Sequence, residues 1–174
     1  MCEVEMDPYR SLSRKFVSRS QAIPILEEAR RRGDVIVFTN GCFDLLHSGH
    51  VLYLQQAKAL GHLLVVGINT DESVRRIKGP RRPVIPLEER ALVLSGLSSV
   101  DMIIPFDEPT PYSLIATVQP DILAKGADWP DSEIIGRELV EARGGRVVRL
   151  PLRKGISTTE IINKILRAYA EPPG

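Results

Sequence analysis

The sequence is poor in cysteine, in aromatic residues and in net charge. Its 174 residues include 2 cysteines and 5% aromatic residues, with 23 Lys and Arg against 22 Asp and Glu. Two cysteines cannot build a disulfide framework or a zinc ribbon. A formal net charge of +1 argues against a general electrostatic binder of nucleic acid, which is normally strongly basic. No nucleic-acid partner is therefore expected, although a local anion site remains compatible with this balance.

Long apolar runs are also missing. No stretch approaches the roughly 20 apolar residues of a membrane-spanning helix, and residues 1–15 carry charges of both signs without the apolar core of a secretory signal. We therefore expect a protein of the reducing cytoplasm with no membrane partner. With 43% hydrophobic and 26% charged residues the chain is too apolar for global disorder, and its length suits one domain with its own core.

Short apolar runs do occur, and they alternate with segments of helical periodicity. A continuous β-branched run predicts a buried strand over 35–39, and further apolar runs of strand length predict strands over 62–68, 100–105, 120–124 and 146–150. Helical patterns occupy 21–32, 49–60, 86–97, 112–118, 134–142 and 158–169. This alternation predicts an α/β fold, a Rossmann-like, doubly wound parallel sheet of about five strands with helices on both faces. The domain is expected over 16–170, with 1–15 as a loose N-terminal segment and 171–174 as a tail.

Such a sheet binds its ligands at the carboxyl ends of its strands. After the first predicted strand the chain reads Asn40-Gly41-Cys42-Phe43-Asp44-Leu45-Leu46-His47-Ser48-Gly49-His50 and then enters a helix. Two histidines at a helix start lie near free backbone N–H groups, which favour phosphate oxygens, and imidazole donors can follow the charge that grows there in a transition state. The alternatives are two surface histidines or a zinc pair, and zinc is disfavoured because only His62 could be a third imidazole ligand.

This segment resembles the signature of the HxGH nucleotidyltransferase superfamily, especially its cytidylyltransferase-like branch. The similarity continues in family order through 69–79, 82–84, 86–90, 100–101, 125–128 and 156–159. As a set, the motifs cover about residues 16–168 and resemble the heptose 1-phosphate adenylyltransferases, the ADP-heptose synthases of lipopolysaccharide core assembly. The resemblance implies a reaction of ATP with D-glycero-D-manno-heptose 1-phosphate that gives ADP-heptose and pyrophosphate. ATP is then a co-substrate that binds with Mg²⁺, and the sugar 1-phosphate is the acceptor. The resemblance further suggests a homodimer.

The implied reaction is a direct, in-line attack of the sugar phosphate oxygen on the α-phosphorus of ATP. Because this nucleophile is already anionic, the protein has to position two polyanions and neutralise charge rather than supply a strong base. By their place in the motif, His47 and His50 are expected to contact the α- and β-phosphates. No carboxylate cluster dedicated to Mg²⁺ stands out, so no residue is assigned as a metal ligand.

The resemblance divides the remaining candidates into two groups. The nucleotide-binding candidates are Asn40, Gly41, Cys42, Phe43, His47, Gly49, His50, Arg90, Lys125, Gly126, Asp128, Ser157, Thr158 and Thr159. The candidates for binding the sugar phosphate are Asp44, Asn69, Thr70, Asp71 and Lys78. Lys78 is also expected to contact the reacting phosphates, and it joins His47 and His50 as a catalytic candidate.

Several candidates have simpler explanations. Lys78 belongs to a basic run on a predicted loop, and such runs are usually solvated surface; its other members are Arg75, Arg76, Arg81 and Arg82. Cys42 could be a reactive thiol, but a small buried residue beside the nucleotide is favoured. Asp44 could be catalytic, order its loop or help bind a cation, and Arg90 could be an exposed helix residue.

The segment before the last helix also has two interpretations. Ser157 and Thr158 could simply cap that helix, although three successive hydroxyls exceed what a cap needs and a second helix N-terminus suits a triphosphate. The glycerol-phosphate cytidylyltransferase pattern has Arg-Thr-x-x before Ile-Ser-Thr, and the different spacing in this chain argues against Arg153 as a phosphate ligand. Trp129 could stack on a base, cover the site or anchor an interface.

The motifs do not separate substrates that differ away from the reacting oxygen. Another small-substrate nucleotidyltransferase, such as a glycerol-3-phosphate cytidylyltransferase, therefore remains an alternative, and the residues alone do not distinguish ATP from CTP. A catalytically silent nucleotide-binding domain is a second alternative, which the intact histidine pair disfavours. A fragment of a tRNA synthetase is disfavoured by the near-neutral charge and by the lack of an anticodon-binding region.

Overall fold

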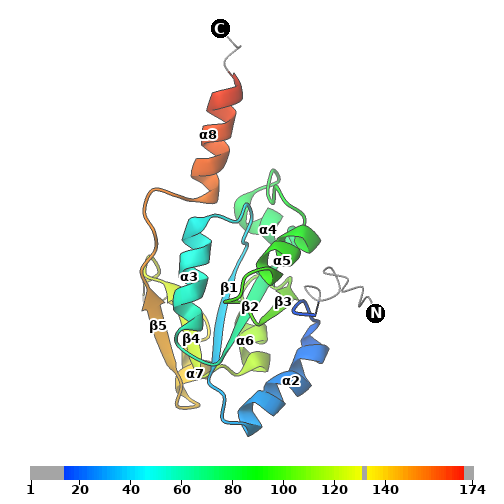
Figure 1. Ribbon diagram of the computed structural model, residues 1–174, viewed down its shortest axis with the longest axis vertical. Coiled ribbons are helices and arrows are strands. Elements are labelled where there is room, and N and C mark those ends of the chain that lie inside the picture. The colour runs from blue at the N-terminus through cyan, green and yellow to red at the C-terminus, as the bar shows by residue number, and fades with distance from the viewer. Residues whose placement is uncertain (1–13, 131–132, 171–174) are drawn as a thin grey trace, which may run out of the picture.

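The computed structural model describes residues 14–130 and 133–170 (Figure 1). Within these residues a parallel sheet of five strands forms the centre, in the order β3-β2-β1-β4-β5. The strands are β1 (Ile36–Gly41), β2 (Leu63–Asn69), β3 (Met102–Phe106), β4 (Ile122–Gly126) and β5 (Arg146–Leu150). The predicted fold class is confirmed.

Helices precede, connect and follow the strands. They are α2 (Arg19–Arg31), α3 (Ser48–Lys58), α4 (Asp71–Lys78), α5 (Leu87–Ser95), α6 (Tyr112–Val118), α7 (Arg137–Glu141) and α8 (Thr158–Ala170). A capping box at Ser18 and Gln21 starts α2, and the hydroxyl of Thr70 caps α4 by accepting from the Ser73 amide. Local side chains therefore fix where these two helices begin.

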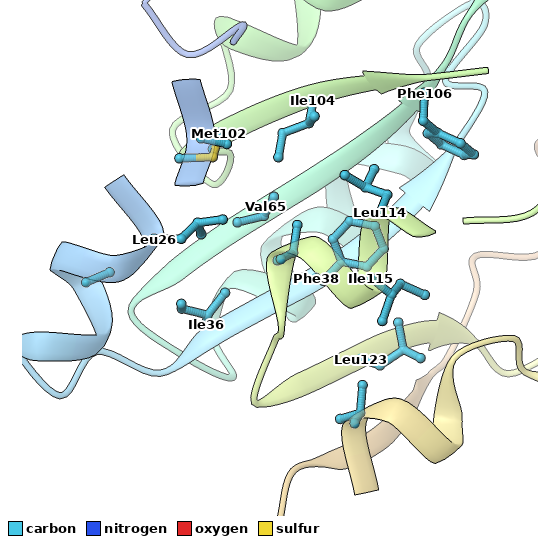
Figure 2. Close-up of a cluster of buried hydrophobic side chains, with 14 of the residues drawn as sticks. Leu26, Ile36, Phe38, Val65, Met102, Ile104, Phe106, Leu114, Ile115 and Leu123 are labelled. Atoms are coloured by element: carbon cyan, nitrogen blue, oxygen red, sulfur yellow. The ribbon is translucent and has the colours of Figure 1, made fainter. Parts of the chain in front are cut away.

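From β1 to β4 the sheet is largely buried on both faces, which explains the apolar runs of these strands. At the edge strand β5, Arg146 and Arg149 are exposed. On one face, Phe38 of β1 and Leu123 of β4 pack with α2, α6 and α7 (Figure 2). On the other face, Val37 of β1 and Ala124 of β4 pack with α3 and α5. We call these the α6 face and the α3 face. Successive strand residues alternate between them.

The strand order reverses next to the central strand. β2 and β3 lie on one side of β1, and β4 and β5 lie on the other. In open parallel sheets, ligands bind beyond the carboxyl ends of the strands at such a reversal. The residues at the ends of β1 and β4 are therefore the first place to look for a site.

The segment after β2 corrects one prediction. The basic run expected as a loop begins inside a helix, since α4 takes in Arg75, Arg76 and Lys78. Acidic residues in its first turn and basic residues in its last turn suit the helix dipole.

At the N-terminal boundary of the predicted domain, the Lys15 carbonyl accepts a hydrogen bond of 2.7 Å from the Ile103 amide of β3. Lys15, the last residue of the segment expected to be loose, is thus attached to the sheet. Residues 1–13 and the predicted tail lie outside the described residues.

Helix α8 extends beyond the carboxyl edge of the sheet (Figure 1). None of its residues is buried. Its large apolar side chains Ile165, Leu166 and Tyr169 are 48%, 60% and 85% exposed. No helix in residues 14–130 and 133–170 is both long enough and apolar enough to cross a membrane.

Candidate active site

The loop after β1 positions the first histidine. Phe43 and Leu45 have φ values of 47° and 43°, so the chain turns there through the left-handed region before α3 begins. His47 is the N-cap of α3, and its Nδ1 accepts a hydrogen bond of 3.1 Å from the Gly49 amide. In the neutral ring this bond leaves the proton on Nε2. A Cβ at Gly49 would lie 2.9 Å from the His47 ring, so a glycine is needed here.

The second histidine stacks on the first. The ring centroids of His47 and His50 are 3.8 Å apart with an interplanar angle of 23°, and Phe43 meets His50 edge-on. Burial, reinforced by His47, lowers the pKa of His50 to about 4. Burial also lowers the pKa of His47. Both rings are therefore neutral at pH 7, and the buried Nδ1 of His50 has no hydrogen-bond partner among the residues that the structure places.

Asp44 orders this loop from inside. It is 1% exposed, and its carboxylate accepts hydrogen bonds from the amides of Val84 and Ile85 and from Arg82 Nε at 2.6 Å. Burial acts to raise the pKa of Asp44, but these hydrogen bonds outweigh it and lower the pKa. Of the roles expected for Asp44, the ordering of the loop is the one that this geometry favours.

Arg90 is buried at 2% exposure, so the interpretation as an exposed helix residue is wrong. Its guanidinium donates to the carbonyls of Cys42, Asn69 and Ile85 at 2.5, 2.9 and 2.9 Å and to the Asp71 carboxylate at 2.6 Å. These four bonds leave one of its five N–H donors. Arg90 therefore ties the ends of β1 and β2 to the start of α4 and to the loop before α5.

Cys42 lies beside the end of β2, where its Sγ is 3.8 Å from Asn69 Oδ1. Burial raises the pKa of the Cys42 thiol, although the nearby cations Lys78, Arg90 and Arg82 act in the opposite direction. A thiol that stays protonated at pH 7 is a weak nucleophile. The structure therefore favours the small-residue interpretation of Cys42 over the reactive thiol.

The basic run separates into paired and unpaired cations. Ion pairs engage Arg75 with Glu72, Arg76 with Asp107, and Arg82 with Asp44. Lys78 forms no ion pair with any residue that the structure describes, and of the cations that act on the Cys42 thiol it has the largest effect. Lys78 is therefore a cation near the β1 loop that a ligand can use.

The end of β2 holds three further candidates, which have protein partners. Asn69 is buried and its Nδ2 donates to Ser73 Oγ at 2.9 Å. The Thr70 hydroxyl donates to the Asp107 carboxylate, and Asp71 pairs with Arg90. These contacts give all three residues a role in ordering the end of β2.

The end of β4 brings two candidates together. The Lys125 ammonium donates a hydrogen bond to Asn40 Oδ1 at the end of β1, and burial lowers the pKa of Lys125 to about 8. At Gly126, a Cβ would lie 2.4 Å from Asp128 Oδ1, so the glycine lets Asp128 fold back over the strand. Asp128 and Trp129 are exposed.

The start of α8 docks on the β1 loop. Ser157 Oγ accepts from the Glu160 amide at 3.1 Å, which is the capping role. Thr158 Oγ1 donates to the Asp44 carbonyl at 2.8 Å, and Thr159 is exposed. Ile156 packs near Gly49 at the start of α3, since its Cγ2 would lie 3.4 Å from a Cβ placed on that glycine. A second helix N-terminus therefore lies next to the histidine pair.

Two residues that shape the site were not among the candidates. Arg82, which pairs with Asp44, is 38 positions away from it, and no local pattern links them. Tyr53 of α3 shares a buried hydrogen bond of 2.8 Å with the Thr39 hydroxyl, and burial raises its pKa to about 12. The sequence indicates Tyr53 only indirectly, because its hydroxyl lies among the apolar residues of the predicted helix over 49–60 and needs a hydrogen-bond partner there.

A histidine pair at the start of the helix that follows the first strand of a Rossmann-like sheet defines a nucleotidyltransferase type of site. The chain belongs to the cytidylyltransferase-like family, which residues 38–164 match. It is similar to the bifunctional protein HldE of Syntrophotalea carbinolica, with 55% identity over 157 residues, or 90% of this chain and 32% of that protein. The bifunctional protein HldE of Pelobacter propionicus is 51% identical over 156 residues, again 90% and 32% of the two chains. The chain thus spans about a third of the length of these relatives.

Solved structures give the same picture of the fold. The lipopolysaccharide core biosynthesis protein from Thermoplasma volcanium superposes with a TM-score of 0.58 at 31% identity, over 71% of this chain and 100% of that one. The pantoate-beta-alanine ligase from Francisella tularensis, solved with beta-gamma ATP and beta-alanine, has a TM-score of 0.59 at 16% identity, over 90% and 79%. This second likeness concerns the fold alone.

Proposed function

We propose that this chain joins ATP and D-glycero-D-manno-heptose 1-phosphate to give ADP-heptose and pyrophosphate. The observation that carries the proposal is the pair of stacked, neutral histidines between two helix N-termini at the carboxyl edge of the sheet. The choice of sugar is supported by the resemblance to heptose 1-phosphate adenylyltransferases. The similarity to proteins described as bifunctional protein HldE and as a lipopolysaccharide core biosynthesis protein supports it further.

In the proposed reaction, a phosphate oxygen of the sugar attacks the α-phosphorus of ATP. The new P–O bond forms as the bond from the α-phosphorus to the bridging oxygen breaks, and pyrophosphate leaves on the opposite side. The Nε2–H of His47 is available to donate to a phosphate oxygen, because its Nδ1 is held by Gly49. Donors fixed in this way stabilise the charge that builds up on the phosphate oxygens.

Three further elements would support the polyanions. Lys78 supplies an unpaired positive charge near the β1 loop. The amide groups at the start of α8 and the exposed Thr159 can donate to the triphosphate. Asp44 with Arg82, and Asp71 with Arg90, hold the loops around the site by ion pairs of 2.6 Å. Asp128 and Gly126 remain candidates for the nucleotide side at the end of β4.

Mg²⁺ would come to the site on the triphosphate. The part of the chain that the structure describes holds no group of three or more His, Cys, Asp or Glu that could bind a metal ion. Among residues 14–130 and 133–170 the ion would thus be held mainly by phosphate oxygens. The proposal includes a cytoplasmic location, which the sparse cysteines favour, and a homodimer, which the resemblance suggests. Sedimentation velocity tests the dimer.

Pyrophosphate release tests the reaction. ATP or CTP is paired with heptose 1-phosphate or with glycerol 3-phosphate, and turnover is expected only with ATP and the heptose phosphate. Turnover with CTP and glycerol 3-phosphate would instead establish the cytidylyltransferase alternative. Absence of pyrophosphate with all four pairs would point to a catalytically silent nucleotide-binding domain.

Variants of the histidine pair test the site. His47→Ala and His50→Ala are each expected to lower kcat by about 100-fold or more, because each removes a donor to the reacting phosphates. His62→Ala is the matched control, since His62 lies at the opposite edge of the sheet, where its Nδ1 accepts from the Val35 amide. Circular dichroism checks that the variants fold. Unchanged rates in both site variants would contradict the roles assigned to them.

A further inference from the structure

One polar pair at the carboxyl edge of the sheet has no part in the reaction described above. The Lys125 ammonium of β4 donates a hydrogen bond to Asn40 Oδ1 of β1. β1 and β4 are the neighbouring strands between which the strand order reverses. The pair therefore occupies the position where an open parallel sheet receives its ligands.

The pair lies on the opposite face of the sheet from the histidine helix. Phe38 and Leu123 belong to the core of the α6 face (Figure 2), and they are paired in the register of β1 and β4. Because side chains alternate along a strand, Asn40 and Lys125, each two residues further on, lie on this same face. The histidines instead begin α3, which packs on the other face.

An independent measure places Asn40 on the same side. A Cβ built on Gly67 of β2 would meet Phe38 at 2.9 Å, Leu114 of α6 at 3.0 Å and Asn40 Cβ at 3.2 Å. These three side chains therefore share the space above the α6 face. Gly67 is also the register partner of Asn40 across β1 and β2.

The pair presents mainly hydrogen-bond donors to a ligand. Of the three N–H bonds of the Lys125 ammonium one points to Asn40, and the occupied Oδ1 leaves the NH₂ group of Asn40 facing elsewhere. No carboxylate within residues 14–130 or 133–170 forms an ion pair with Lys125, and its lowered pKa is caused by burial. A partly buried cation without a counter-ion is costly unless a ligand supplies anionic oxygen.

A third polar residue continues the row on the neighbouring strand. Val65 of β2 belongs to the core of the α6 face, so Asn69, four residues further on, lies on that face as well. Asn69, Asn40 and Lys125 thus lie on this one face at the ends of the neighbouring strands β2, β1 and β4. Asn69 is two residues beyond Gly67, the register partner of Asn40. Asn69 is a residue that the resemblance already assigns to the sugar phosphate.

We propose that Asn40 and Lys125 bind the sugar 1-phosphate, with Lys125 donating to an anionic oxygen and Asn40 held by Lys125 so that its NH₂ group donates to the same substrate. This assignment rests on the proposed function, and it replaces the expectation that both residues contact the nucleotide. In the proposed function the histidines and the start of α8 hold the triphosphate on the α3 face. The sugar 1-phosphate therefore binds on the α6 face, at the ends of the same strands. It can then approach the α-phosphorus from the side opposite the leaving pyrophosphate.

Initial rates with both substrates varied test the assignment. Lys125→Met is expected to raise the KM for heptose 1-phosphate by about 10- to 100-fold, the effect of losing one charge-assisted hydrogen bond, and to change the KM for ATP by less than about 2-fold. Lys125→Arg, which keeps the charge, should recover part of the loss. Asn40→Ala should raise the same KM by a smaller factor. Lys164→Met, which removes an exposed lysine of α8, is the control and should match the wild type.

The outcomes separate this assignment from the proposed function. If wild-type protein releases no pyrophosphate from ATP and heptose 1-phosphate, the proposed function fails and this assignment fails with it. If the wild type turns over but Lys125→Met raises the KM for ATP, or changes neither KM, only the assignment is overturned. Should Lys125→Met fail to fold by circular dichroism, Lys125→Arg and Asn40→Ala carry the same test, and an unchanged KM for the sugar phosphate in both overturns it.

Discussion

Burial controls the chemistry of His47 and His50. Two imidazoles at a centroid distance of 3.8 Å cannot both carry a charge cheaply, and burial adds to the cost of protonation. In the free protein the pair is therefore a set of neutral donors and acceptors, which does not need a counter-ion. A bound triphosphate would bring negative charge beside the rings and favour their protonated forms. The site can thus respond to the charge of its ligand without carrying a permanent charge itself.

The lowered pKa of His50 predicts how stability depends on pH. In the folded chain this pKa is about 4 against an ordinary value of 6.5, so the folded state binds fewer protons than the unfolded state between these values. The resulting stabilisation is complete above pH 6.5 and is lost as the pH falls toward 4, by about 2 to 3 kcal/mol at most. Denaturant unfolding between pH 7.5 and 4.5 measures the loss, and His50→Asn should show a flatter profile than the wild type. Parallel profiles for the two proteins would contradict the assignment to His50.

The strands were easier to predict from the sequence than the segment that joins β2 to α5. The strands β1 to β4 are largely buried and give apolar runs. The edge strand β5 has exposed arginines, and its Val147-Val148 pair still marked it as a strand. Helix α4 buries only Ser73 and Val74 and is held by Arg–Glu pairs along its exposed side, so its sequence looks like a charged loop. The HxGH segment was recognisable because its residues are adjacent. The contacts of Arg90 were not, since they join positions 42, 69, 71 and 85 only after folding.

This convergence predicts a large effect for one substitution in α5. Arg90→Met should lower the free energy of unfolding by about 3 to 5 kcal/mol, because it leaves Asp71 and three carbonyls without their buried cation. It should also lower kcat/KM by about 10-fold or more, since the ends of β1 and β2 lose their common anchor. Asp71→Asn, which keeps the three carbonyl contacts, is the matched control and should cost less in both measurements. Urea unfolding and steady-state rates give the two values, and an Arg90→Met protein as stable as the wild type would refute the anchoring role.

At the scale of the whole molecule, residues 14–130 and 133–170 form a packed sheet domain and a helix that leaves it. The sheet has a core on each face, whereas α8 is attached at its start, where Thr158 donates to the Asp44 carbonyl. This attachment joins α8 to the loop that carries His47. The first turn of α8 therefore belongs to the site, while the rest of the helix lies outside the packed domain (Figure 1).

This division predicts unequal protection of amide hydrogens along α8. A helix of 13 residues that buries no side chain is only marginally stable in water, so amides 164–169 should exchange orders of magnitude faster than those of β1 and β2. Helix α3 is the internal control, because its 11 residues include the buried Tyr53, Leu54 and Ala57. Added ATP should slow exchange in the first turn of α8, which adjoins the histidines, and leave 164–169 unchanged. If the amides of 164–169 exchange as slowly as those of α3 at low protein concentration, the apolar side of α8 is instead covered in solution.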